Sequence, residues 1–235
     1  MKMIKKCFIL LVCSWLISSC ATIGKSDHRS SQPEDIIIKN ELILDEEFDI
    51  IWDRLVKKLA SGFYVINNID KSSRIINVSY TSNNPEKYVD CGSTHRTYVR
   101  GSEEVTYDYE IASSCNYKMA SAGGVYGNFP ITYFINRNTS LDGRVNIYVA
   151  PIDKGTLVTV NCRYIFTVKV DGLAQQENAF GTIVYSQQIP QQSSSVTANT
   201  NSPGIADWGD YKNPVKIKCV SLGVLESEIL DFARP

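Results

Sequence analysis

The stretch VNIYVAPIDKGTLVTVNCRYIFTVKV, residues 145–170, decides the fold of this chain. Apolar and polar residues alternate from Val145 to Val149, PIDKG at 151–155 is typical of a turn, and a second alternating run continues to Val170. Strict alternation is the period of a β-strand with one buried face, so the stretch predicts a hairpin in an antiparallel sheet covered on one side. The second run puts its apolar residues on one face: Val158, Val160, Cys162, Tyr164, Phe166, Val168 and Val170.

Two other segments have helical spacing. Between Asp45 and Ser61 an apolar stripe is preceded by acidic residues, lysines lie near its end, and Gly62 is a natural stop. Ser221–Phe232 repeats the spacing near the C-terminus. We therefore expect two amphipathic helices. The first stripe contains Phe48, Ile51, Trp52, Leu55, Val56 and Leu59, and we interpret Trp52 as a core residue.

The remaining pattern completes the predicted domain. We expect a first strand at 36–44, a hairpin from 63–66 and 74–80, and further strands near 105–111 and 179–186. Residues 187–216 are rich in Gln, Ser, Asn, Pro and Gly, which predicts a long polar loop. The expected fold is a single α+β domain over 36–235, with one antiparallel sheet packed on one face against two helices.

The first twenty residues have the features of an export signal. Lys2, Lys5 and Lys6 form a basic start, Phe8–Ile17 is an apolar run too short to span a bilayer, and small residues lead to Cys20. This ending resembles the lipobox of bacterial lipoproteins. The resemblance implies that residues 1–19 are a cleaved signal peptide and that Cys20 carries lipid. An ordinary signal peptide or a retained helix is the alternative.

The same resemblance implies a location. Ala21 and Thr22 replace the aspartate that marks retention in the inner membrane, so we expect attachment to the bacterial outer membrane, facing the periplasm. Residues 20–35 are polar and predict a lipidated flexible tether, in which His28 is a solvated residue. Without the signal lysines, 21 basic and 25 acidic residues remain, a net charge near −4. That balance predicts no nucleic-acid partner and membrane contact through the lipid alone.

Four cysteines remain for the domain, namely Cys91, Cys115, Cys162 and Cys219. In an oxidising compartment they predict two disulfides, although three pairings are open. A zinc site is the alternative, but the spacing is wide and lacks Cys-x-x-Cys. We prefer Cys91 with Cys219 and Cys115 with Cys162. The first pair ties down the C-terminal segment, and the second joins strand-like segments in the middle of the fold.

One segment resembles a known family. FDIIWDRL at 48–55, GFYV at 62–65 and IINVSY at 75–80 are similar to the helix-grip domain of the lipoprotein called component C of the outer-membrane β-barrel assembly machinery. The match covers roughly residues 36–82 and, loosely, the terminal helix. That family has two such domains and a long partner-binding segment, whereas one domain and a short tether are expected here. YVDCG at 88–92 with CVS at 219–221 looks more like a cysteine-stapled variant among exported lipoproteins.

The sequence predicts no enzyme, cofactor or metal site. It has no Gly-x-Ser-x-Gly elbow, phosphate loop or His-Glu-x-x-His pair. His95 is interpreted as a polar loop residue and Glu103-Glu104 as a solvated turn. The resemblance implies an accessory or scaffolding subunit of an envelope assembly of the barrel-assembly, secretion or conjugation type, with envelope proteins as partners. The alternative is a periplasmic lipoprotein that holds an apolar molecule between sheet and helix, with unassigned binding residues. Its candidate linings are the glycine-rich loop at 120–130 and Tyr107, Tyr109, Tyr117, Tyr126, Tyr133 and Tyr148.

Overall fold

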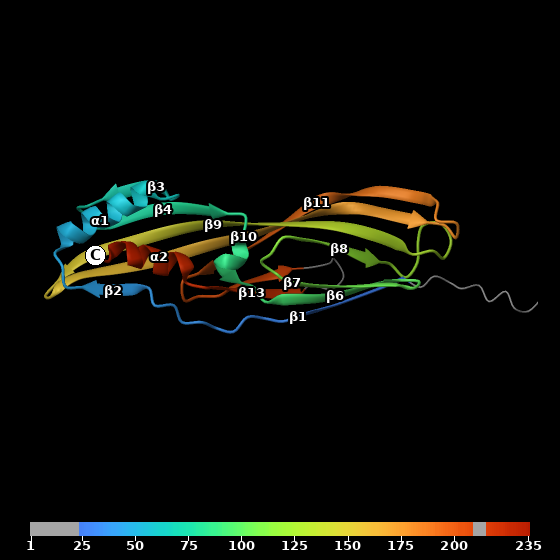
Figure 1. Ribbon diagram of the computed structural model, residues 1–235, viewed down its shortest axis with the longest axis horizontal. Coiled ribbons are helices and arrows are strands. Elements are labelled where there is room, and N and C mark those ends of the chain that lie inside the picture. Colours follow the sequence, from blue (N-terminus) through green and yellow to red (C-terminus); the bar gives the residue numbers. More distant parts are fainter. Residues whose placement is uncertain (1–23, 209–214) are drawn as a thin grey trace, which may run out of the picture.

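The computed structural model describes residues 24–208 and 215–235, which form an elongated, mostly β structure with two helices (Figure 1). Its central element is one long hairpin of β9 (Ile131–Ile152) and β10 (Gly155–Glu177), which pair antiparallel along their whole length. Gly155 turns the chain with φ of +95°, and a Cβ there would lie 2.0 Å from the Leu44 carbonyl oxygen. The predicted hairpin at 145–170 is confirmed and continues about 14 residues beyond Arg144 toward the other end of the molecule.

We divide the hairpin at the pair Leu141 and Phe166. The helical half is the part from these residues to the turn, with β2 (Glu41–Leu44), β3 (Val65–Asp70), β4 (Ile75–Ser82), α1 (Phe48–Ser61) and α2 (Val224–Ala233). The distal half is the remainder, where β8 (Cys115–Ala120) pairs with β9 and β11 (Ile183–Asn199) pairs with β10. Together these strands form one seven-stranded antiparallel sheet.

In the helical half the two predicted helices are confirmed. The apolar stripe of α1 is buried, and α1 contacts α2 as well as β9 and β10. Most of this core is aliphatic, and Glu226 of α2 and Tyr164 of β10 add buried polar groups to it. The aliphatic side chains that are fully buried include Ile51, Leu55, Leu59, Ile147, Val158, Val160, Leu225 and Ile229. Trp52 is 4% exposed and belongs to the same core, as predicted.

In the distal half a second sheet replaces the helices. It consists of β1 (Gly24–Ser30), β6 (Ser93–Arg100) and β7 (Glu103–Glu110), and β1 and β6 contact β8. A third small sheet joins β5 (Val89–Asp90), β13 (Val215–Ser221) and β12 (Gly204–Trp208) beside the short helix η1 (Pro85–Lys87). The strands therefore divide among three antiparallel sheets rather than the single sheet that the sequence predicts.

The sequence predicts two flexible segments, and both predictions are wrong. Residues 24–30 of the expected tether form β1, paired residue by residue with β6, and much of the expected loop at 187–216 forms β11, β12 and the start of β13. Both β1 and β11 lie at sheet edges with largely exposed side chains, so backbone pairing holds them without an apolar pattern that composition would reveal. The predicted strand at 36–44 shortens to β2.

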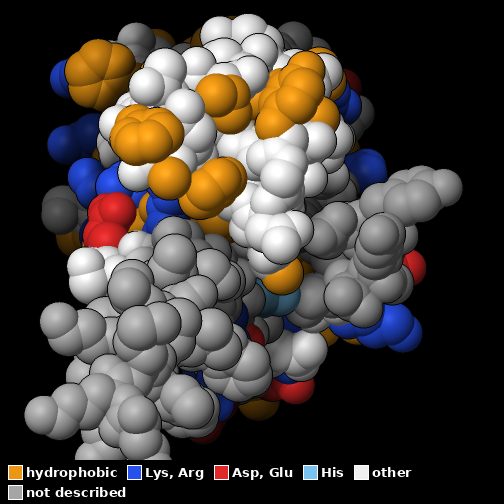
Figure 2. All heavy atoms as spheres, turned by 90° about the vertical axis from the view of Figure 1, so that its right-hand side faces the viewer, with side chains coloured by type: hydrophobic (Ala, Val, Ile, Leu, Met, Phe, Trp, Pro, Cys, Tyr) orange, Lys and Arg blue, Asp and Glu red, His pale blue; other side chains and the backbone are white. Residues whose placement is uncertain are grey.

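Some predictions fall outside the described residues. These are the signal peptide at 1–19, lipidation at Cys20, and the part of the polar loop at 209–214. Neither α1 nor α2, the two α-helices in the described ranges, is long and apolar enough to cross a membrane. Figure 2 views the molecule end-on from the side of the distal half.

Candidate functional site

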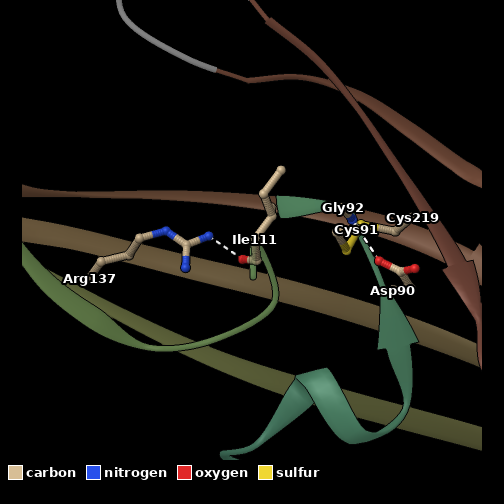
Figure 3. Close-up of a disulfide and its surroundings, with 6 residues drawn as sticks. All are labelled: Asp90, Cys91, Gly92, Ile111, Arg137 and Cys219. Atoms are coloured by element: carbon tan, nitrogen blue, oxygen red, sulfur yellow. Dashed lines mark hydrogen bonds between the residues drawn. A yellow bond between two sulfur atoms is a disulfide. The ribbon is translucent and has the colours of Figure 1, made fainter. Parts of the chain in front are cut away.

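The disulfide joins the end of β5 to β13. Cys91 and Cys219 are bonded, with Cα atoms 4.1 Å apart, and both residues are buried (Figure 3). The bond closes a loop of 128 residues and lies beside the short β5–β13 ladder. It therefore fixes the strand that leads directly into α2 to the segment that leads into β6, as expected for this pair of cysteines.

The chain turns sharply beside the bond. Gly92 has φ of +84°, and its N–H donates to the Asp90 Oδ1 at 2.7 Å. A Cβ at this position would lie 1.9 Å from the Ser31 carbonyl oxygen, so the N-terminal segment packs directly on the Gly92 backbone. The Ser31 N–H also donates to the Ser93 carbonyl at 2.9 Å. Residues immediately after β1 are thus part of the disulfide region.

An open groove of about 500 Å³ runs alongside the disulfide between residues 31–34, η1 and the start of β6. Four carboxylates line it, from Glu34, Glu86, Asp90 and Glu110, and no lysine or arginine does. The electrostatic character of the groove is therefore acidic, which suits a basic segment better than an apolar molecule. Within 24–208 and 215–235, no three His, Cys, Asp or Glu side chains gather as a metal-binding group.

The predicted bridge between Cys115 and Cys162 is wrong, since both thiols are free. Cys115 lies opposite Arg137 of β9, whereas Cys162 lies opposite Val145. Eight residues of β9 separate these two positions (145 − 137 = 8), which at about 3.3 Å per residue is about 26 Å. A disulfide needs Cα atoms within about 7 Å, so strand register forbids the bond.

Cys162 belongs to a buried polar cluster under α2. The fully buried Glu226 carboxylate accepts hydrogen bonds from the Tyr164 hydroxyl at 2.6 Å and the Thr200 hydroxyl at 2.8 Å, and the Ser221 hydroxyl lies 3.3 Å from it. Burial raises the pKa of the Cys162 thiol well above its ordinary value, and the nearby Glu226 carboxylate adds to the rise. The cluster fixes the start of α2 against β10, and Cys162 is a structural thiol.

In the distal half, two arginines enclose two stacked tyrosines. The rings of Tyr109 and Tyr117 are 5.8 Å apart and nearly parallel, with Arg96 4.5 Å from the Tyr117 ring and Arg137 5.6 Å from the Tyr109 ring. Arg137 is 5% exposed and donates to the Ile111 and Ser113 carbonyl oxygens (Figure 3 draws the first of these bonds). The stack joins the β6–β7 sheet to β8 and β9, so these tyrosines pack rather than line a pocket.

Both histidines of the chain lie in neighbouring strands. His28 is in β1 and His95 in β6, where the His95 Nδ1 lies 2.7 Å from the Asp108 Oδ1 at the surface. Glu103 and Glu104 lie in β7 and not in a turn, and Glu103 pairs with Lys118 at 2.8 Å. The prediction that the chain is not an enzyme stays a prediction.

Sequence reasoning missed Arg137, Gln176 and Glu226 as buried polar residues. Arg137 in β9 and Gln176 in β10 each occupy a position that faces inward in the alternating burial pattern of the strand. This alternation of inward and outward positions is the only sequence signal that points to their burial. Comparisons with protein-family models, with curated proteins and with solved structures found no match to this chain.

Proposed function

We propose that this chain is a lipid-anchored, periplasm-facing accessory or scaffolding subunit of a bacterial envelope assembly of the barrel-assembly, secretion or conjugation type, attached to the outer membrane through Cys20. The observation that carries the proposal is the position of β1. Gly24 follows Cys20 by four residues and already belongs to a sheet of the folded domain (24 − 20 = 4). A lipid on Cys20 would therefore hold the domain itself, and not a free linker, at the membrane.

The arrangement of the two halves supports a scaffolding role. β9 has 22 residues, so the hairpin extends about 70 Å at about 3.3 Å per residue. The helical half lies at one end and the start of β1 near the other (Figure 1). A subunit of this shape holds its helical half at a distance from its anchor, where envelope proteins can contact it.

The packing of the helical half favours a helix-grip arrangement of its two helices and the sheet. Both helices lie against β9 or β10 and contact each other, which supports a helix-grip arrangement within this half. The space between helices and sheet is filled by fully buried side chains, among them Leu55, Ile147 and Leu225. An apolar ligand would have to displace them, so the packing favours the scaffolding proposal over the ligand-binding alternative.

The test is purification of the tagged full chain from detergent-solubilised membranes, followed by mass spectrometry. We expect an N-terminal peptide that begins at lipid-modified Cys20, and stoichiometric recovery of an envelope complex. The Cys20→Ala variant is the matched control, and it should lose the modification. An unmodified Cys20 contradicts the anchor. A lone lipidated protein carrying a small apolar molecule supports the ligand-binding alternative.

A further inference from the structure

The end of the distal half carries a cluster of exposed apolar side chains, which we call the tip. Its members are 40–92% exposed, with Phe180 the most exposed: Val125, Tyr126, Phe180, Ile183 and Val184. Figure 2 looks onto this end of the molecule and shows several hydrophobic side chains close together on its surface. Exposed apolar surface of this kind marks contact with a partner or a membrane, because water disfavours it.

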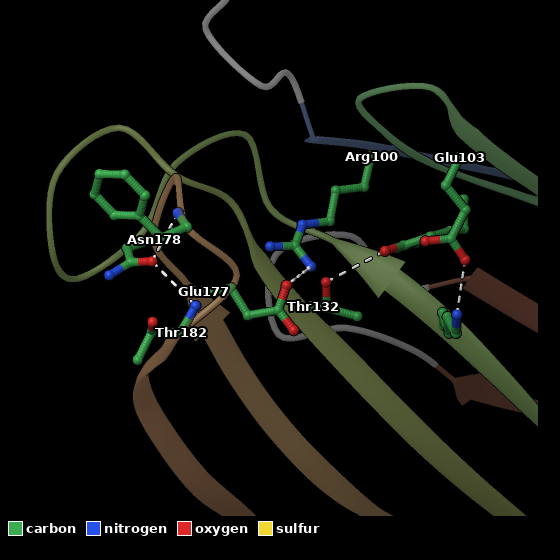
Figure 4. Close-up of polar contacts among 9 residues, drawn as sticks. Arg100, Glu103, Thr132, Glu177, Asn178 and Thr182 are labelled. Carbon is green, nitrogen blue, oxygen red and sulfur yellow. Dashed lines mark hydrogen bonds and ion pairs between the residues drawn. The ribbon is translucent and has the colours of Figure 1, made fainter.

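The turn between β10 and β11 presents Phe180 in a fixed position. The Asn178 Oδ1 accepts hydrogen bonds from the N–H groups of Phe180 at 2.9 Å and Thr182 at 3.0 Å, and the Asn178 N–H donates to the Thr182 carbonyl at 2.9 Å (Figure 4). Gly181 has φ of +75°, which completes the tight turn. Phe180 is 92% exposed, although the N–H groups of Phe180 and of the next residue, Gly181, are both hydrogen-bonded to Asn178.

A buried glutamine fixes the second loop of the tip, between β8 and β9. The Gln176 Oε1 accepts from the N–H groups of Val125 and Tyr126, each at 3.0 Å. Its Nε2 donates to the carbonyl oxygens of Tyr126 at 2.6 Å and Phe129 at 2.9 Å. Gln176 is fully buried, and its side-chain amide makes all of these hydrogen bonds to the loop. The bonds fix the loop backbone with the Val125 and Tyr126 side chains facing outward.

The N-terminal end of the described chain packs against the same loop. A Cβ at Gly24 would lie 2.2 Å from the Ser121 carbonyl oxygen and 2.4 Å from the Pro130 Cβ. Cys20 precedes Gly24 by four residues, and four residues reach at most about 14 Å. A lipid on Cys20 therefore keeps Gly24, which packs on the loop that carries Val125 and Tyr126, within about 14 Å of the lipidated cysteine.

The charged side chains behind the tip neutralise one another. Arg100 pairs with Glu177 at 2.9 Å and Lys118 with Glu103 at 2.8 Å (Figure 4). The tip thus presents apolar and aromatic groups with no unpaired charge from these four residues. A tyrosine favours the interfacial layer of a bilayer, where its ring is shielded and its hydroxyl stays hydrated, and the apolar ring of Phe180 is shielded from water there.

We infer that the tip inserts into the interfacial layer of the bilayer beside the lipid anchor, so that the hairpin projects from the membrane with the helical half at its far end. This inference rests on the proposed lipidation of Cys20. Its ligand is a lipid surface, recognised by apolar contact rather than by charge. Insertion adds a second attachment to the acyl chains and sets the orientation of the domain, which a lipid alone does not.

The test places a tryptophan at either end of the full chain as the cell processes it. Phe180→Trp reports the tip, and Phe63→Trp is the matched control, because Phe63 is 96% exposed in the helical half. Each protein is incorporated into vesicles of phosphatidylethanolamine and phosphatidylglycerol whose acyl chains carry bromine, which quenches tryptophan on contact. We expect the Phe180→Trp chain to lose more fluorescence than wild type, and the Phe63→Trp chain to match wild type.

Equal quenching of the two variants overturns the inference, and so does quenching of Phe63→Trp alone. Tyr126→Trp repeats the test at the loop held by Gln176 and should behave as Phe180→Trp does. Mass spectrometry of the N-terminal peptide is read separately from the same samples. If Cys20 is unmodified, the proposed anchor fails, but quenching of the Phe180→Trp variant after addition of vesicles still supports tip insertion, and its absence still contradicts it.

Discussion

The two halves of the β9–β10 hairpin share one ladder but have different interiors. The helical half buries aliphatic side chains under two amphipathic helices, whereas the distal half buries Arg137, Thr139 and Gln176 under loops and a small sheet. The covering element explains the difference. The stripe of α1 offers apolar groups, and the buried Glu226 of α2 is satisfied by nearby hydroxyls. In the distal half, tyrosines, arginines and loop backbone offer rings and carbonyl oxygens to buried polar side chains.

The difference extends to the surface. Both halves expose some large apolar side chains, among them Phe63 in the helical half, but in the distal half Val125, Tyr126 and Phe180 lie on loops whose N–H groups are hydrogen-bonded to Gln176 and Asn178. In the distal half, the buried side chains of Gln176 and Arg137 therefore position loops through hydrogen bonds to the loop backbone. The helical half is organised for stability, and the distal half for presenting the tip.

Removing the disulfide should have the largest effect, because the bond ties the strand before α2 to the segment that leads into β6. The double variant Cys91→Ser, Cys219→Ser should lose about 5 kcal/mol of unfolding free energy in the chain-entropy model. Urea denaturation measures it. Cys115→Ser is the matched control, since Cys115 is free. A loss equal to that of the control would contradict the structural role of the bond.

Truncating the aliphatic core should come next. Leu55 is fully buried between α1 and the sheet, and Leu55→Ala should cost about 3 kcal/mol through lost burial and a cavity. Phe63→Ala, at a site that is 96% exposed, should change stability by less than about 0.5 kcal/mol. Urea denaturation compares the two. Similar losses of unfolding free energy in the two variants would show that Leu55 is not tightly packed in the helical half.

The distal half should respond locally. Gln176→Leu leaves the N–H groups of Val125 and Tyr126 without their acceptor, at a cost of about 2 kcal/mol. Amide hydrogen exchange should rise in residues 121–130 and stay unchanged in α1. Gln188→Leu, at an exposed position of β11, is the control. Unchanged amide exchange at 121–130 in the Gln176→Leu variant would show that Gln176 does not hold this loop in place.

The free thiols give the smallest expected difference. Burial raises the pKa of both thiols, but at Cys115 the Arg137 and Arg96 guanidinium groups oppose the rise, and Cys115 is only half-buried. A thiol with a raised pKa is mostly protonated and slow to alkylate. At pH 8, iodoacetamide should therefore modify Cys115 faster than Cys162, as peptide mass spectrometry measures. Faster modification of Cys162 would contradict its burial.

Much of the helical half could be predicted from the sequence, because apolar periodicity reports burial directly. The stripe of α1, the Ser221–Phe232 spacing and the alternation at 158–168 all lie where expected. The distal half could not be predicted in the same way. Edge strands β1 and β11 are held largely by backbone pairing and carry mostly exposed side chains, and the register that separates Cys115 from Cys162 depends on which strand lies next to which.

The support of the tip was also hidden from sequence reasoning. Gln176 follows Gln175, and composition makes neither one special. Only the three-dimensional path of residues 124–129 brings three backbone positions within reach of one buried amide. The unpredicted features are therefore those set by contacts between distant segments.

The orientation of the hairpin on a membrane tests the difference between the two halves most directly. Neutron reflectometry of the lipidated full chain on a supported bilayer measures the thickness of the protein layer. Insertion of the tip predicts a layer of about 70 Å, the length of a 22-residue strand, with the helical half farthest from the lipid. A layer much thinner than the hairpin, with the helical half against the headgroups, would contradict it.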